Sequence, residues 1–234
     1  MMIISDIRAL ANLAHEAGAL LAVDNTFLSP HFQKPLTLGA DLVLHSGTKY
    51  LCGHNDIIAG FLTVAEGHDA LAERIQRLVV SSGPNLSTMD AWLMLRSLKT
   101  LGVRVERQAA TAKTIADWLG TEKHVTHVYY PGLPSHPGYE LQCQQATDFG
   151  GMVSFKVDSA ERAQNILGRL KLIAFAESLG GVESLLTYPK VQTHAEMPEE
   201  LMKATGLDDK LLRLSVGLED ADDLMADLEQ AING

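Results

Sequence analysis

The sequence predicts an α/β protein whose first part contains a parallel sheet and whose second part is a smaller α+β domain. Two observations carry this prediction. Residues 19–23, 41–46 and 56–64 are continuous apolar runs with a helical pattern between some of them, which is typical of buried parallel strands. Residues 150–157 instead alternate between apolar and polar side chains, which indicates a half-exposed strand and a change of architecture.

The elements of the first part follow from capping signals and apolar spacing. A helix is expected to begin after Ser5 and to end at Gly18. Its apolar positions follow helical spacing: Ile7, Leu10, Ala11 and Ala14. The three apolar runs supply strands. From residue 89 to about residue 119 the pattern predicts a long helical stretch, with Gly102 as a bend or break.

The second part is expected to alternate strands and helices. Residues 124–139 contain a strand and then a loop rich in proline and glycine, and residues 172–181 read as a strand and a turn. The other expected elements are strands at 150–157 and 210–217 and helices at 161–170 and 219–232. The last helix has acidic residues in its first turn, which suits the helix dipole.

Composition narrows the class of protein. The chain has 234 residues and a formal net charge of −10, which argues against nucleic acid or an anionic membrane surface as a partner but leaves room for a small anionic ligand. No apolar run reaches the roughly 18 residues of a membrane span. Cys52 and Cys143 form neither a disulfide framework nor a metal quartet, and no metal site is expected around His124 and His127. These features predict a cytoplasmic protein.

One group of polar residues stands at expected strand ends. Asp24 ends one apolar run, and Ser46, Thr48 and Lys49 follow the next, so they would meet at one edge of a parallel sheet. This combination suits pyridoxal 5′-phosphate (PLP). A lysine forms a Schiff base with its aldehyde, a carboxylate keeps its pyridine nitrogen protonated, and hydroxyls bind its phosphate. The alternative is that Asp24 caps a loop and Lys49 is a solvated lysine, because short patterns recur by chance.

Four long blocks, which together span essentially the whole chain, favour the first interpretation. The block "VDNTFLSPHFQKPLTLGADLVLHSGTKYLCGHNDIIAGFLTV" resembles the lysine region of the PLP enzymes of cysteine and methionine metabolism. The other blocks are "MLRSLKTLGVRVERQ", "VYYPGLPSHPGYE" and "FAESLGGVESLLTYP" with "THAEMPEE" and "LLRLSVGLED". The chain differs in "SGTK", because this family usually has alanine where Gly47 stands.

The resemblance implies a role for each cofactor residue. Lys49 resembles the lysine that forms the Schiff base and moves protons among the substrate carbons. Asp24 resembles the partner of the pyridine nitrogen, and Ser46 and Thr48 resemble phosphate ligands.

The resemblance also implies roles in substrate binding. Arg213 resembles the arginine that grips the substrate α-carboxylate, a task suited to a guanidinium fork, and Ser178 resembles a second carboxylate contact. Glu177 matches a position that is often glutamate in γ-synthases and γ-lyases. Thr193 is a weaker candidate for the substrate pocket.

The fold implied by the resemblance is the aspartate-aminotransferase type, or fold type I. Residues 1–100 would be the later part of the large PLP-binding domain, and residues 101–234 would be the C-terminal small domain. In the family, a glycine-containing phosphate loop, a ring-stacking tyrosine and a Tyr/Arg pair lent to a neighbouring subunit lie upstream of the point that matches "MMIISDIRAL". The sequence is therefore expected to be N-terminally truncated.

The implied function is PLP-dependent transsulfuration of the cystathionine γ-synthase or γ-lyase type, by γ-elimination or γ-replacement. Glu177 and "THAEMPEE" favour these two activities. Cystathionine β-lyase, methionine γ-lyase and O-acylhomoserine sulfhydrylase are alternatives on the same scaffold, and an inactive truncated fragment is a further one. The implied partners are a small amino-acid substrate, namely cystathionine, a homoserine ester, cysteine or methionine, and copies of the same chain in a homotetramer, a dimer of dimers.

Overall fold

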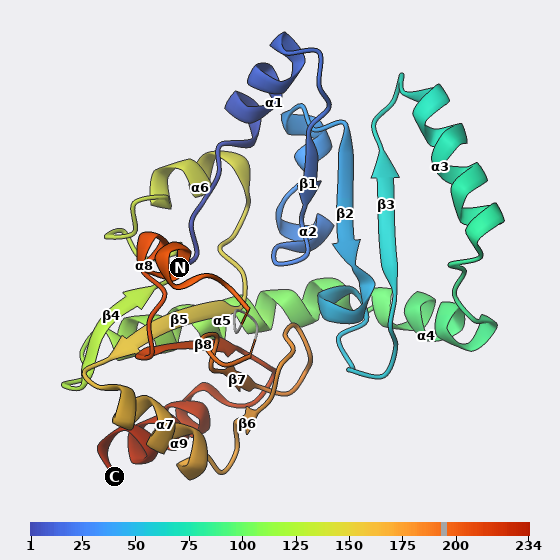
Figure 1. The fold of residues 1–234 in the computed structure, drawn as a ribbon. Coiled ribbons are helices and arrows are strands. Elements are labelled where there is room, and N and C mark those ends of the chain that lie inside the picture. Colours follow the sequence, from blue (N-terminus) through green and yellow to red (C-terminus); the bar gives the residue numbers. More distant parts are fainter. Residues whose placement is uncertain (193–195) are drawn as a thin grey trace.

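The computed structural model describes residues 1–192 and 196–234, which form two sheets linked by a long helix (Figure 1). The first sheet has the strand order β1-β2-β3, with the bounds Ala22–Asp24, Leu42–Ser46 and Gly60–Val64. β1 and β2 are parallel, as predicted, whereas β3 runs antiparallel to β2. The prediction of parallel strands is thus wrong for β3. Its link to β2 contains only one helical turn, Gly47–Leu51, and a parallel return needs a longer crossover.

The first sheet is also more exposed than its apolar runs predict. Leu44, Phe61 and Leu62 expose 39%, 36% and 42% of their surface, so these strands are not buried on both faces. The helices α1 (Ile7–Glu16), α2 (Ser29–Phe32) and α3 (Asp69–Ser82) lie around this sheet (Figure 1). The predicted cap of the first helix is off by one residue, because the side chain of Asp6, not of Ser5, accepts the Ala9 amide.

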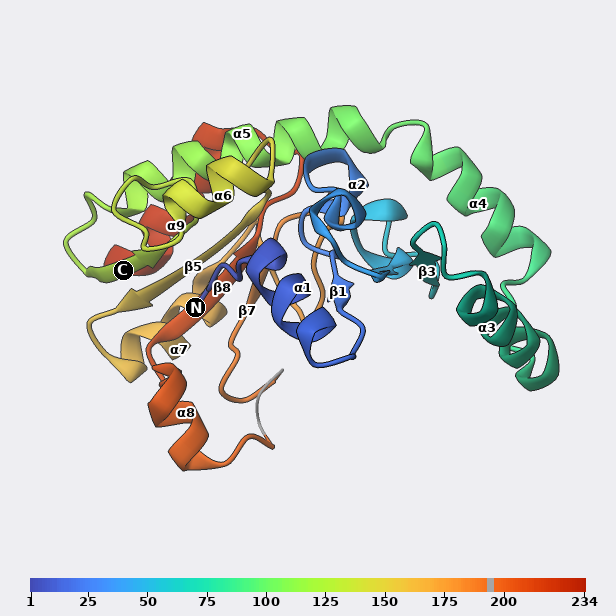
Figure 2. The same cartoon turned by 90° about the horizontal axis from the view of Figure 1, so that it is seen from above.

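The predicted long helical stretch is two helices, α4 (Thr88–Leu98) and α5 (Leu101–Leu119). The break falls at residues 99–100, and Gly102 lies inside α5 rather than at the bend. Figure 2 shows α4 and α5 as a bent rod that extends from the second sheet toward α3. The first half of α5 packs in the core beside the first sheet, and its second half packs in the core of the second sheet.

The second sheet has five strands in the order β4-β5-β8-β7-β6. In chain order their bounds are Val125–Tyr129, Met152–Val157, Ala174–Phe175, Leu185–Thr187 and Leu211–Ser215. The prediction of a half-exposed strand at 150–157 is wrong. β5 lies between β4 and β8 with α5 and α7 packed against it, and its polar Ser154 is buried together with its apolar residues.

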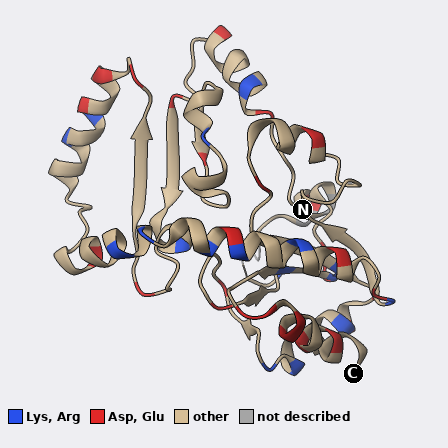
Figure 3. Ribbon diagram, turned by 180° about the vertical axis from the view of Figure 1, so that it is seen from behind, with Lys and Arg blue, Asp and Glu red and all other residues tan. Residues whose placement is uncertain are grey.

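Among the described residues, the second part of the chain also contains the helices α6 (Tyr139–Gln145), α7 (Ala160–Arg169), α8 (Glu199–Thr205) and α9 (Ala221–Asn233). α9 packs against α5 and α7, and its side chains Leu224, Leu228 and Ile232 are fully buried. Asp220 caps α9, and acidic residues follow in its first turn, as Figure 3 shows by colour near the C-terminus.

The described residues were compared with the requirements of a membrane-spanning helix and of a metal site. In the part of the chain that the structure describes, no helix combines the length and the apolar character needed to cross a membrane. Within residues 1–192 and 196–234, no cluster of three or more His, Cys, Asp or Glu side chains is arranged to hold a metal ion.

Candidate active site

The candidate site begins with the turn that carries Lys49. A short kinked turn, Gly47–Leu51, follows β2, with Lys49 in a non-helical backbone conformation (φ −90°, ψ −126°), and the amides of Gly47 and Thr48 both donate to the Ala59 carbonyl. A Cβ atom at Gly47 would lie 2.7 Å from the Phe61 ring and 2.8 Å from the Ala59 Cβ. The glycine that stands where the resemblance expects alanine is therefore matched to the close approach of β3.

The amine of Lys49 meets the second part of the chain. Lys49 Nζ donates to Ser178 Oγ at 3.0 Å, across 129 positions of sequence. Ser178 opens the turn that follows β6, and in this turn Gly180 has a φ of +77°. A Cβ atom at Gly180 would lie 2.7 Å from the Tyr50 amide nitrogen, so glycine allows the two turns to touch.

Burial and two charges set the electrostatics of Lys49. The pKa of Lys49 lies below its ordinary value, first because burial disfavours the ammonium and second because Arg213 repels it. Glu177 acts in the opposite direction and raises the pKa. The amine is consequently neutral over a wider pH range than that of a solvated lysine, which favours reaction with an aldehyde.

Removal of the Glu177 charge is expected to lower the pKa of Lys49 further. Glu177 stabilises the ammonium, so Glu177→Gln leaves burial and Arg213 unopposed. Competitive acetylation of the protein at a series of pH values, read for each lysine by mass spectrometry, gives the midpoint for Lys49. Glu161→Gln, at an exposed position in the first turn of α7, is the matched control. A midpoint that stays in place or rises in Glu177→Gln contradicts this assignment.

Arg213 projects from β8, and some of its N–H donors make no hydrogen bond in the described structure. Its Nη2 is 3.4 Å from Thr187 Oγ1, and its buried Nε has no hydrogen-bond partner among the residues that the structure describes. Burial lowers the pKa of Arg213, and Glu177 opposes that effect. Arg213 as a whole is half-buried, but a buried guanidinium donor without a partner is costly unless an anion pairs with it, so this geometry suits a ligand carboxylate.

Asp24 and Ser46 lie at the carboxyl ends of the parallel strands β1 and β2, as predicted. Thr26 links them, because its hydroxyl donates to Asp24 Oδ1 at 2.6 Å and accepts from the Ser46 amide at 2.8 Å. The Asp24 side chain is exposed and also accepts the Thr26 amide at 3.0 Å. At this edge of the sheet, the Thr26 hydroxyl therefore fixes the position of the Asp24 carboxylate relative to the backbone of Ser46.

Thr48 and Thr193 complete the predicted set. The Thr48 hydroxyl accepts from the Ala59 amide at 3.0 Å and makes a longer contact of 3.4 Å with the Ala59 carbonyl. The second contact is weak, which leaves this hydroxyl able to donate to an anion instead. Thr193 lies outside the described residues, so the structure gives it no position.

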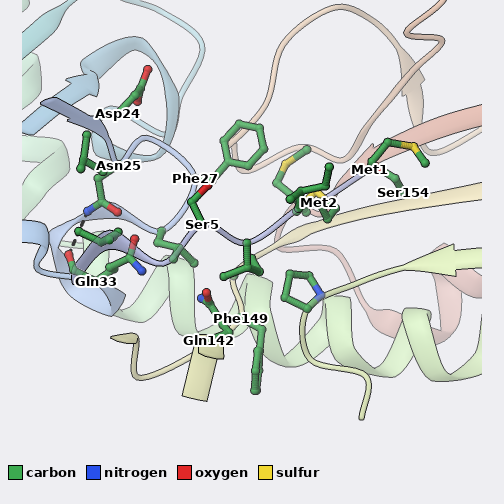
Figure 4. A pocket seen from close by; sticks show the side chains of 18 of the residues that line it. Met1, Met2, Ser5, Asp24, Asn25, Phe27, Gln33, Gln142, Phe149 and Ser154 are labelled. Atoms are coloured by element: carbon green, nitrogen blue, oxygen red, sulfur yellow. Dashed lines mark hydrogen bonds between the residues drawn. The ribbon is translucent and has the colours of Figure 1, made fainter. Parts of the chain in front are cut away.

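Four of the predicted residues line two cavities, whereas Ser46, Lys49 and Glu177 line neither of them. Asp24 and Arg213 line one cavity of about 680 Å³ between the two sheets. Figure 4 shows Asp24 and Asn25 at one end of it and Met1 and Ser154 at the other, and Ser154 lies opposite Arg213 on the neighbouring strand. Thr48 and Ser178 line a second cavity of about 670 Å³.

Several residues of the site were not singled out from the sequence. Thr26 stands two positions after Asp24, where a hydroxyl commonly bonds a preceding aspartate, so its role was detectable. Thr187, which contacts Arg213, depends on the pairing of β7 with β8 and had no local signal. Arg104 and Gln108 are buried polar residues on α5, and helical spacing alone places them one turn apart.

Comparison with known proteins gives a consistent result. A model of the family described as "Cys/Met metabolism PLP-dependent enzyme" matches residues 1–233. The chain is 48% identical over 229 residues to a cystathionine γ-lyase of Bacillus subtilis and 46% identical over 227 residues to a cystathionine β-lyase of Lactococcus lactis. These matches cover 98% and 97% of this chain but 60% and 59% of the two relatives.

A solved structure agrees in fold. A cystathionine γ-synthase from Xanthomonas oryzae pv. oryzae, in complex with aminoacrylate and cysteine, superposes with a TM-score of 0.94 and 43% identity. The match covers 98% of this chain and 59% of that one. The chain thus has the fold of the fold type I PLP enzymes over its described length and spans about 60% of the length of the curated relatives.

Proposed function

The chain belongs to the Cys/Met metabolism family of PLP-dependent enzymes, and on this premise we propose that it serves PLP-dependent transsulfuration of sulfur amino acids. The proposed reaction is γ-elimination or γ-replacement, as in a cystathionine γ-lyase or γ-synthase. One observation supports it most directly. The half-buried Lys49 amine lies 3.0 Å from Ser178 Oγ. The positive charge of Arg213 lowers the pKa of this amine, and the negative charge of Glu177 raises it.

The residues present fit the cofactor. PLP, when bound, supplies an aldehyde that condenses with amines and a protonated ring that accepts the electron pair released at a neighbouring carbon. Lys49 would hold it covalently, since a lowered pKa makes the amine nucleophilic. Asp24, exposed at the end of β1, would pair with the ring nitrogen. The hydroxyls of Ser46 and Thr48 would donate to the phosphate.

The substrate contacts proposed from the geometry involve Arg213 and Ser178. Arg213 would bind the α-carboxylate through its unused donors, and Ser178 would add a second hydrogen bond once Lys49 moves away from it. Thr193 remains a proposed pocket residue. The aminoacrylate and cysteine held by the Xanthomonas relative support a small amino acid as the ligand class.

Lys49 would also move the proton. Its four-carbon stem lets one amine serve more than one substrate carbon, and a pKa below that of a solvated lysine favours the balance between the neutral amine, which accepts a proton, and the ammonium, which returns it. The opposing effects of Arg213 and Glu177 would tune that balance. Glu177 is exposed, so it can approach the amino group of a larger substrate from the solvent side.

β-Elimination is the second candidate, because the identities to the γ-lyase and the β-lyase are nearly equal, at 48% and 46%. Incubation of the PLP-loaded protein with cystathionine separates the two. γ-Elimination consumes one water and gives cysteine, 2-oxobutanoate and ammonia, whereas β-elimination consumes one water and gives homocysteine, pyruvate and ammonia. A homoserine ester with cysteine tests γ-replacement, with cystathionine as the product. If PLP-loaded protein forms none of these products, the proposed function is wrong.

The remaining features of the whole protein are proposals of the same kind. We propose a homotetramer, built as a dimer of dimers, and a cytoplasmic location, which two free cysteines support. We also propose that residues 1–100 belong to the large PLP-binding domain and residues 101–234 to the small domain. This boundary would fall at the start of α5.

A further inference from the structure

Helix α5 carries two buried polar side chains that face the candidate site without lining either of its cavities. Arg104 is 3% exposed and Gln108 is fully buried. They are four positions apart, so they project from the same face of the helix. The helix passes from the core beside the first sheet into the core of the second, as Figure 1 shows, and these two residues lie at that passage.

Arg104 holds the turn that carries Lys49. Its Nη1 donates to the Tyr50 carbonyl at 2.8 Å and its Nη2 to the Leu51 carbonyl at 3.3 Å. The other donors reach the Ser97 carbonyl at 3.1 Å and the Thr100 hydroxyl at 3.1 Å. No carboxylate pairs with Arg104 in the described part of the chain. Three of these four hydrogen bonds go to backbone carbonyls, and two of those carbonyls belong to the residues that directly follow Lys49.

Gly53 shows how tightly the chain wraps this guanidinium. Its φ is +73°, and its amide donates to the Lys49 carbonyl at 2.7 Å, which closes the turn. A Cβ atom at Gly53 would overlap Arg104 Nη1. Both the left-handed backbone and the position of the guanidinium therefore require glycine here.

Gln108 holds the other half of the site. Its Nε2 donates to the Gly181 carbonyl at 2.7 Å and to the Val216 carbonyl at 3.0 Å. Gly181 belongs to the turn that starts at Ser178, and Val216 directly follows β8, the strand that carries Arg213. One side-chain amide thus fixes both the turn of Ser178 and the end of the strand of Arg213.

We propose that Arg104 and Gln108 are positioning residues, which lock the Lys49 turn and the Ser178–Arg213 half of the site at a fixed separation along α5. Neither residue touches substrate or cofactor in this account. Each acts through backbone carbonyls that belong to the two halves. The inference rests on the proposed function only in taking Lys49 as the reactive amine.

The test measures the reactivity of the Lys49 amine as a function of pH, and it requires neither bound cofactor nor turnover of a substrate. Competitive acetylation across pH gives the labelling midpoint of Lys49 in the unmodified protein and in each variant. In Arg104→Met the turn is released, Lys49 leaves the buried place beside Arg213, and its midpoint moves upward from that of the unmodified protein. Arg104→Lys can still hold one carbonyl and is expected to shift the midpoint less. Gln108→Met, which frees the Ser178 turn, is expected to shift it in the same direction.

A matched control separates positioning from general loss of packing. Arg162 also donates to a backbone carbonyl, that of Ile232 at 2.6 Å, but lies on α7 away from the Lys49 turn. Arg162→Met is expected to leave the Lys49 midpoint in place.

Several outcomes would overturn the inference. One is an unchanged Lys49 midpoint in Arg104→Met that retains a cooperative thermal transition, and another is an equal shift in Arg162→Met. If Arg104→Met does not fold, Arg104→Lys and Gln108→Met decide, and unchanged midpoints in both reject positioning. Absence of transsulfuration products in the unmodified protein would reject the proposed function alone, since labelling of Lys49 requires no reaction.

Discussion

Replacing Lys49 by arginine is expected to abolish covalent attachment of PLP and to lower turnover by roughly 10²–10⁴-fold or more, the usual contribution of a positioned proton-transfer group. Arginine keeps the positive charge, but its guanidinium stays protonated and cannot condense with an aldehyde. It also cannot return a proton to a substrate carbon. Absorbance spectra of PLP-loaded protein and initial rates of product formation measure the two losses separately.

Lys99→Arg is the matched control for this substitution. Lys99 is an exposed lysine that caps α4 and has no contact with the candidate site in the described structure. Its replacement is expected to leave the spectrum and the rates unchanged. A Lys49→Arg protein that keeps the spectrum and turnover of the unmodified protein would show that another amine binds PLP covalently and transfers the proton.

Arg213→Lys is expected to weaken amino-acid binding by about 2–4 kcal/mol, or roughly 30- to 1,000-fold, the range for breaking a buried, hydrogen-bonded charge pair. Lysine retains the charge but loses the planar fork and its two parallel donors. The buried Nε, which lacks a partner in the described structure, marks the donors that a carboxylate would use. Because the α-carboxylate is bound before and during reaction, KM should rise more than kcat falls.

The control for Arg213→Lys is Arg162→Lys. Arg162 is a partly buried arginine on α7 that donates to Asp158 Oδ1 at 2.7 Å, away from both cavities. Its replacement should leave KM unchanged. An unchanged KM in Arg213→Lys would reject the carboxylate contact, and a fall in kcat alone would assign Arg213 to the reaction step instead.

The local elements of the fold were largely predictable from sequence. β2 and β8 were predicted nearly to the residue, because each is a short apolar run with clear flanking signals. The direction of β3 was not predictable from its own residues, since it depends on the length and path of the link after Lys49. The burial of β5 also depends on tertiary neighbours, and the alternating pattern of its residues pointed to the opposite result.

The site was predictable where residues are close in sequence or where the resemblance matched long blocks. Lys49 and its hydroxyl neighbours occur within four positions, and Asp24 ends the preceding strand. The hydrogen bond between Lys49 and Ser178 joins two turns that follow strands of different sheets, so no periodicity could give it. The supporting polar contacts of Arg104 and Gln108 were missed for a related reason. A polar residue on a helix reads as exposed until its carbonyl partners are known.

Every proposed role in the site depends on Lys49 being the amine that would hold the cofactor. The most direct measurement is borohydride reduction of the protein after incubation with PLP, followed by peptide mass mapping of the bound pyridoxyl group. We expect one dominant label, on Lys49, and its loss in Lys49→Arg. A label that falls instead on Lys34 or Lys99, or a protein that acquires no label at saturating PLP, would contradict it.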